Sequence, residues 1–248
     1  HPALAKGRLE RTLASRQIGH GGLSADHDRP LHIDDRASLI YTLCKAAELE
    51  HLIICQYLFA AWSLKKDTSE GLAEAALPMV RGWAKTLFEI AEQEMLHLAL
   101  VQNLLTSVGA GPHFSRPNFP VPPRAFPARI QIALMPFNEE SLRHFAYLER
   151  PEGDAAAVED AQMFAAVEQA VPLPDIEEDT IGPIVADFAT ISHLYRSIED
   201  GLEALAARMG EEKLFIGPAT AQATGEHFRF PELVPVVGLA SAKAAIEV

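Results

Sequence analysis

The feature that most constrains this chain is a helical pattern over residues 80–108 that carries a glutamate and a histidine on its apolar face. Apolar side chains recur there at steps of three and four, the spacing of one helix face. Glu94 and His97 occupy positions on that face where leucine or isoleucine would be expected. Glu-x-x-His alone is common on solvated helices. A buried, unpaired carboxylate costs several kcal/mol, however, so this position favours a compensating cation held by both side chains.

A second helix is expected over residues 35–65, and it carries one acid in the middle of its apolar face. That acid is Glu50. The neighbouring Glu48-x-x-His51 repeats the motif, but Glu48 lies about 200° behind this face and His51 about 100° ahead of it. Tyr57 lies two turns beyond Glu50 on the same face. It is either a hydrogen-bond partner of a site or a core tyrosine with a hydrated tip.

A third helix is expected over residues 177–209, where His193 lies almost opposite the apolar stripe. The face around His193 is narrow and carries small, nearly uncharged side chains. Such a face predicts a helix that is buried on two sides. His193 is therefore either a further metal ligand or a core histidine hydrogen-bonded to a neighbour. Glu199 flanks the apolar stripe and is a further candidate carboxylate ligand. The predicted ligand set consists of Glu50, Glu94, His97 and His193.

The remaining segments connect these helices. Residues 110–137 hold seven of the seventeen prolines and form a long crossover, in which residues 130–134 are a candidate short edge strand. Asn138 is expected to cap a helix after it. Leu239 begins a further helical pattern that stops in mid-pattern at residue 248, with no capping residue before it. Carboxylate-bridged bundles use four helices, so we expect the fourth helix to be incomplete in this sequence.

Composition narrows the class of protein. With 48% hydrophobic and 22% charged residues, the chain is globular. A net charge of −13 argues against nucleic acid or an anionic membrane surface as the main partner. No apolar run approaches the roughly 20 residues that span a bilayer, and the first residues do not resemble a signal peptide, so we expect a cytoplasmic protein. Cys44 and Cys55 lie about 16 Å apart along one helix, too far for a disulfide.

Several motifs of this chain occur together in a known family. They are Glu94-Met-Leu-His97 with Gly109 after it, the segment around Glu50, Leu134-x-Pro136-Phe137, Phe145-x-x-x-Glu149-x-Pro151 and Thr190-Ile191-x-x-Leu194-Tyr195-x-x-Ile198. They resemble the ferritin-like domain of iminophenyl-pyruvate dimer synthases and related bacterial proteins. The Glu94–His97 segment resembles the second helix of that domain closely, and the segment around Glu50 is similar to its first helix.

The resemblance implies an all-α, ferritin-like four-helix bundle over residues 36–248, preceded by an N-terminal arm over 1–35. It implies a metal site, usually of iron, in which Glu50, Glu94 and His97 fit the ligand pattern. The family tends to have glutamate where this chain has His193, so the metal and its nuclearity stay open: di-iron, mononuclear iron or another divalent metal. The family also continues into a full fourth helix. Either this sequence is a fragment, or a second polypeptide or second copy completes the site.

Three functions fit these observations. The first is a metal-dependent oxidoreductase that uses dioxygen on a small organic, amino-acid-derived or aromatic metabolite; the substrate class rests on the resemblance. The second is a ferritin-type metal-binding or storage protein without an organic substrate. The third is a structural role, in which the acids pair with buried Arg or Lys. The Pro-rich crossover favours the first. We expect a homo-oligomer with no nucleic acid or membrane partner.

Overall fold

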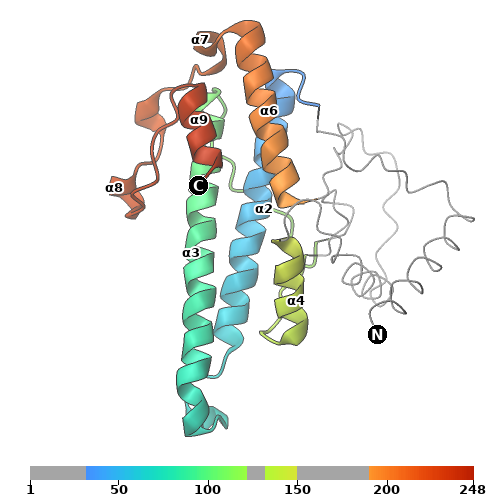
Figure 1. Ribbon diagram of the computed structural model, residues 1–248, viewed down its shortest axis with the longest axis vertical. Coiled ribbons are helices and arrows are strands. Elements are labelled where there is room, and N and C mark those ends of the chain that lie inside the picture. The colour runs from blue at the N-terminus through green and yellow to red at the C-terminus, as the bar shows by residue number, and fades with distance from the viewer. Residues whose placement is uncertain (1–31, 122–131, 150–189) are drawn as a thin grey trace, which may run out of the picture.

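Two long antiparallel helices form the centre of the molecule. The computed structural model describes residues 32–121, 132–149 and 190–248. Helix α2 (Arg36–Ser63) and helix α3 (Leu77–Ser107) run side by side along the long axis (Figure 1). A short connection joins them, so residues near the middle of one helix face residues near the middle of the other. This pairing sets the height at which Glu50 meets the Glu94–His97 turn.

The other helices pack around this pair. Helix α4 (Glu139–Leu148) and helix α6 (Ile191–Met209) follow one another beside α2, and helix α9 (Leu239–Ile246) packs against α3 and α6 (Figure 1). Short helical turns complete the order: Thr68–Glu70, Glu74–Ala76, α7 (Glu211–Leu214), Ala219–Ala221 and α8 (Gly225–Phe228). The regular structure of the described residues is therefore all-α, as the helical patterns predicted.

Helix α2 begins at a side-chain cap, one residue after the start of the predicted range 35–65. The Asp35 carboxylate accepts a hydrogen bond from the Ser38 backbone N–H at 2.7 Å, and the Asp35 N–H donates to Ser38 Oγ at 3.1 Å. This reciprocal capping box satisfies two helix-terminal donors. Beyond the first turns α2 is buried around most of its circumference, because α3 covers one side and α4 and α6 the other.

The ends of α3 follow the proline and glycine signals. Pro78 lies in the first turn of α3, where a missing N–H costs nothing. Helix α3 begins at Leu77, three residues before the predicted boundary at residue 80. At the other end Gly109 adopts a left-handed φ of 85°, which suits the residue after a helix.

The predicted third helix over residues 177–209 is wrong at Thr190. The backbone of Thr190 is extended, and its side chain accepts a hydrogen bond from the His193 N–H at 3.1 Å, so α6 begins at Ile191. A threonine N-cap interrupts the helix although the apolar spacing continues through it. Residues 177–189 lie outside the described residues, as does the predicted arm up to residue 31.

The described part of the Pro-rich crossover packs on α2. Gln56 Nε2 donates to the Ala133 carbonyl at 3.0 Å, and the Phe137 N–H donates to Ser63 Oγ at 2.7 Å. The short edge strand expected over residues 130–134 is not formed by its described residues. A single antiparallel bridge joins Val121 to Ile132 instead; residues 130 and 131 lie outside the described ranges.

Two buried amide side chains fix the irregular C-terminal segment to the bundle. Asn103 of α3 donates to the carbonyls of Ala223 and Val234 and accepts from the Ala223 N–H, at 2.8–3.1 Å. Gln222 exchanges two hydrogen bonds with the backbone of Val236. These bonds replace secondary structure for buried backbone groups and lead the chain into α9. Within the described ranges, no helix is long and apolar enough to cross a membrane.

Helix α4 offers a direct test of local capping. The Asn138 side chain accepts from the Ser141 N–H at 2.9 Å, and Ser141 Oγ accepts from the Asn138 N–H at 2.8 Å. Asn138→Ala removes the first bond and is expected to lower the free energy of unfolding by about 1 kcal/mol. Asn138→Asp keeps an acceptor and should stay within about 0.5 kcal/mol of the parent. Urea denaturation measures both, and equal values for the two variants would contradict the assigned cap.

Candidate metal centre

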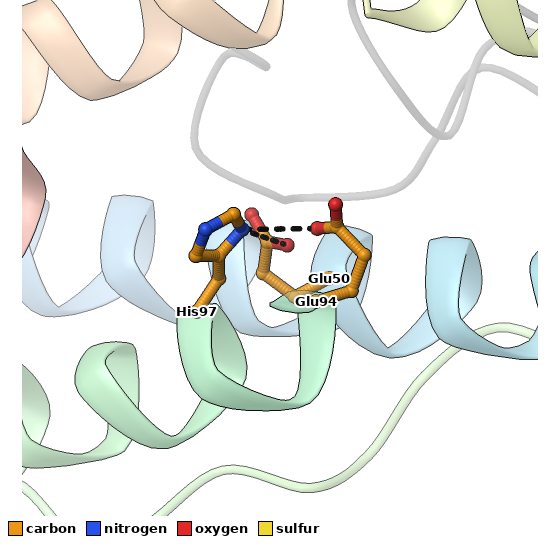
Figure 2. Close-up of side chains that lie close together, drawn as sticks. All are labelled: Glu50, Glu94 and His97. Atoms are coloured by element: carbon orange, nitrogen blue, oxygen red, sulfur yellow. Dashed lines mark hydrogen bonds and ion pairs between the residues drawn. The ribbon is translucent and has the colours of Figure 1, made fainter. Parts of the chain in front are cut away.

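Three of the four predicted ligands converge between α2 and α3. His97 Nδ1 lies 3.1 Å from Glu94 Oε2 and 3.8 Å from Glu50 Oε2 (Figure 2). One ligand atom from each residue lies within 4.8 Å of the other two. Glu94 and His97 stand one turn apart on α3, and Glu50 faces them from the middle of α2. Glu50 is 1% exposed and Glu94 7%, whereas a third of the His97 side chain reaches solvent.

Two tyrosines extend this cluster. Tyr195 Oη, in the second turn of α6, donates to Glu50 Oε1 at 2.5 Å. Tyr57 Oη, two turns beyond Glu50 on α2, donates to Glu149 Oε1 at 3.2 Å. Of the two alternatives for Tyr57, the hydrogen-bonding role is the observed one. Tyr195 fixes one oxygen of Glu50 and leaves the other, Oε2, directed toward His97 and Glu94.

Burial and mutual repulsion govern the charges at the cluster. Burial, followed by the charge of Glu94, raises the pKa of Glu50 well above its ordinary value. Burial also acts to raise the pKa of Glu94, but its hydrogen bonds with His97 and Glu50 outweigh this effect and lower the pKa overall. The hydrogen bond to Glu94 raises the pKa of His97. Without a bound cation, the protons held by Glu50, Glu94 and His97 are therefore interdependent, because the charge of each group shifts the pKa of the others.

A cavity of about 400 Å³ opens beside the cluster. Glu50, Glu94 and His97 form part of its wall, and α6 and α9 form the opposite side. Apolar lining residues come from α2, α3, α6 and α9: Ile53, Leu100, Val101, Leu104, Ile191, Ala245 and Ile246. A small molecule in this cavity would lie directly against the carboxylates and the imidazole.

Comparison with known families agrees with this geometry. The model of the Ferritin-like family matches residues 43–248, which include all of the cluster. The chain belongs to the Ferritin-like family. The resemblance seen in the sequence is thereby confirmed, and so is the predicted ferritin-like helical fold.

Two curated proteins with significant similarity carry the names of enzymes. The chain is 34% identical over 166 residues to the 2-imino-3-(indol-3-yl)propanoate dimerase of Chromobacterium violaceum, a match that covers 59% of this chain. It is 26% identical over 190 residues to the dichlorochromopyrrolate synthase of Lentzea aerocolonigenes, covering 69% of this chain. In each case the matched region is 17% of the relative's length.

A solved structure supports the fold independently. A ferritin-like protein from Caulobacter vibrioides shares the fold with a TM-score of 0.50 and 19% identity; the match covers 88% of this chain and 66% of that one. At this identity the likeness concerns the fold. The ferritin-like bundle therefore rests on both the family model and a solved structure.

Sequence reasoning missed Glu149 as a member of this ferritin-like site. Glu149 caps the C-terminal end of α4 and lines the cavity together with Glu50 and Glu94. Glu149 is exposed as a residue, whereas its carboxyl group is largely surrounded by protein atoms. This desolvation, followed by the charge of Glu94, raises the pKa of Glu149. The segment Phe145-x-x-x-Glu149 was part of the family resemblance, which is the signal that could have found it.

The structure does not bring His193 into the three-residue group found among the described residues. His193 is fully buried in α6, and its carbonyl accepts a hydrogen bond from Ser197 Oγ at 2.8 Å. Burial of both residues agrees with the predicted burial of the small-residue face. Tyr195, two residues along, is the α6 side chain that reaches Glu50. A metal-ligand role for His193 has no support from this geometry.

The other acids singled out in the sequence have distinct positions. Glu199 lines the cavity and forms an ion pair with Lys243 of α9 at 2.9 Å, so it lies near the cluster but outside it. Glu48 pairs with Lys45 at 2.8 Å and with His113 at 3.1 Å, on a different side of α2 from Glu50. Glu48 and Glu50 thus lie on different faces of α2, as their helical angles predicted.

Proposed function

We propose that this chain forms the metal-binding part of an enzyme that oxidises a small, amino-acid-derived aromatic metabolite with dioxygen. The observation that carries the proposal is the convergence of Glu50, Glu94 and His97 at the wall of a 400 Å³ cavity. A storage site needs only the ligands. A substrate-binding enzyme also needs a cavity beside them, and this one has both apolar walls and acidic groups.

The donor set fits a divalent transition metal. When Glu50 is ionised, its buried Oε2 has no hydrogen-bond donor within the described ranges, and its ion pair with His97 Nδ1 is long, at 3.8 Å, so a cation would stabilise this oxygen. Carboxylate oxygen and imidazole nitrogen suit iron, manganese and zinc, and Glu-x-x-His on a bundle helix is a recurrent di-iron ligand pair. Among the described residues, the ion pairs of Glu50 and Glu94 run to His97. We therefore propose iron, as one ion or two, with Glu50, Glu94 and His97 as ligands.

Each residue of the site then has a role. Glu50, Glu94 and His97 hold the cation, and Tyr195 orients Glu50 by donating to Oε1. Bound iron would supply redox chemistry with dioxygen. Glu149, whose pKa is raised, can hold a proton on its carboxyl group at the edge of the cavity. The aliphatic wall from α3, α6 and α9 excludes water from the reacting groups.

The relatives suggest the substrate class. The Chromobacterium violaceum relative is named for an indole-bearing 2-imino acid and its dimerisation. The region that matches this chain is 17% of that protein. The substrate class proposed for this chain is a 2-imino or 2-oxo acid with an aromatic side chain. Arg196 lines the cavity and offers a guanidinium for the carboxylate of such an acid.

Dioxygen uptake by the Fe(II)-loaded protein tests the proposal. Indole-3-pyruvate in ammonium buffer, which equilibrates with the 2-imino acid, is expected to raise the rate of uptake at least about tenfold over iron-loaded protein alone. His97→Ala, given the same iron, measures the background reaction of free iron. Uptake that stops once the bound iron is oxidised, and that the organic acid leaves unchanged, would contradict the enzyme and favour the storage alternative.

A further inference from the structure

A second cavity lies beside the metal centre and is lined mainly by aromatic and aliphatic side chains. It measures about 700 Å³ and lies between α2, α3 and α4. Its apolar walls come from all three helices and the end of the crossover: Tyr57, Leu64, Trp83, Leu87, Ile90, Phe137, Leu142, Phe145 and Ala146. No ligand has yet been assigned to this second cavity.

Two ring pairs form its aromatic walls. Trp83 and Phe137 have ring centroids 5.7 Å apart, and Tyr57 and Phe145 have centroids 4.4 Å apart. Trp83 is nevertheless 42% exposed and Leu142 54%, so these large apolar groups are accessible at the open side. Exposed aromatic surface of this kind gains free energy when another ring covers it.

The polar end of this cavity connects it to the metal centre. Glu149 lines both cavities, and its carboxylate accepts from Tyr57 Oη at 3.2 Å. Ile90, one turn before Glu94 on α3, lines the apolar part. A molecule in the second cavity would therefore have Glu149 at one end, with Glu94 and His97 just beyond it. Protonated or ionised, the Glu149 carboxyl group has more acceptor positions than the one that Tyr57 Oη occupies, so it can accept a further hydrogen bond.

We propose that the second cavity binds the aromatic ring of the substrate, with Glu149 accepting a hydrogen bond from a ring N–H. This inference rests on the proposed function for the identity of the substrate, but the ring site stands on its own geometry. The occupant is a bicyclic, nitrogen-bearing aromatic ring of indole type. Its size suits the cavity, its faces match the Trp83–Phe137 and Tyr57–Phe145 walls, and its single donor matches Glu149, the carboxyl group that lines both cavities.

Equilibrium dialysis of indole against the full chain tests the ring site without requiring metal or turnover. Trp83→Ala is expected to weaken indole binding at least about tenfold, because it removes one wall. The matched control is Phe88→Ala: Phe88 lies on the same helix, is 40% exposed and contacts Trp62 rather than the cavity. Phe88→Ala should stay within about twofold of the parent. Leu142→Trp, which narrows the cavity from α4, should weaken binding as Trp83→Ala does.

A second probe tests the hydrogen bond. 1-Methylindole has the same ring without the N–H and is expected to bind the parent about tenfold more weakly than indole. Glu149→Leu should abolish this difference, because no acceptor then distinguishes the probes. An unchanged difference in Glu149→Leu would overturn the role of Glu149. Equal weakening by Trp83→Ala and Phe88→Ala, or no indole binding by the parent, would overturn the ring site.

These outcomes separate the ring site from the metal chemistry. His97→Ala should lose the oxidase activity and keep indole binding near the parental level. A parent that binds indole through Trp83 but consumes no dioxygen would retain the ring site and reject the proposed reaction. A parent that is active while Trp83→Ala leaves indole binding unchanged would reject the ring site alone.

Discussion

Glu94→Ala and His97→Ala are each expected to abolish metal binding, with affinity falling at least about a hundredfold. Each substitution removes one of three ligands that lie within 4.8 Å of one another, and the remaining pair cannot hold an ion with comparable strength. Iron content is measured by atomic emission after anaerobic loading with Fe(II) and gel filtration. Circular dichroism confirms that the helices persist, since both substitutions shorten side chains without breaking an apolar contact of the core.

The chain supplies a matched control for this experiment. His113 and Glu48 lie 3.1 Å apart, the same separation as His97 and Glu94. Glu48, which lies on α2, is a buried carboxylate as Glu94 is. His113→Ala therefore removes an equivalent histidine–glutamate contact away from the proposed ligands and should leave the iron content unchanged. Equal iron in the parent, Glu94→Ala and His97→Ala would exclude both the enzymatic and the storage functions.

Periodicity predicted most of the fold, because the long helices are bounded by strong local signals. The predicted ranges 35–65 and 80–108 agree with the observed ends of α2 and α3 to within three residues. The failure at Thr190 has a local cause. Apolar spacing continues through it, so the stripe alone indicates one helix, while the extended Thr190 backbone and its bond to the His193 N–H interrupt it. A side-chain cap changes a helix boundary without changing the hydrophobic pattern.

The site was predictable where an acid interrupts an apolar stripe. Glu50 and Glu94 stood out for this reason, and the structure brings them to His97. Glu149 gave no such signal, since it follows the last turn of a ten-residue helix and reaches the cavity through the packing of α4 on α2. His193 does not join this group among the described residues, and its role as a ligand stays a prediction. Both faces of α6 are buried, and periodicity does not say that the face carrying Tyr195 is the one that meets Glu50.

Glu50→Gln is expected to stabilise the metal-free protein at pH 8 by about 1–3 kcal/mol. Burial raises the pKa of Glu50, so ionising it in the folded state is costly. For a raised pKa, the stability contribution is complete below the unfolded value near 4.3 and declines as pH rises through the folded value. The advantage of Gln should therefore be small at pH 5 and largest at pH 8. Guanidinium denaturation of chelator-treated protein at both pH values measures it.

Glu48→Gln is the control for Glu50→Gln, because Glu48 is a buried carboxylate of the same helix with a lysine and a histidine as partners. Removing its charge breaks favourable pairs, so Glu48→Gln should give no gain at pH 8. With saturating Fe(II), the parent should become more stable to unfolding than Glu50→Gln. Metal binding stabilises the folded parent, whereas the Gln variant lacks one of the ligands. A parent more stable than Glu50→Gln both with and without metal would mean that Glu50 is compensated by the protein itself and has no need of a cation.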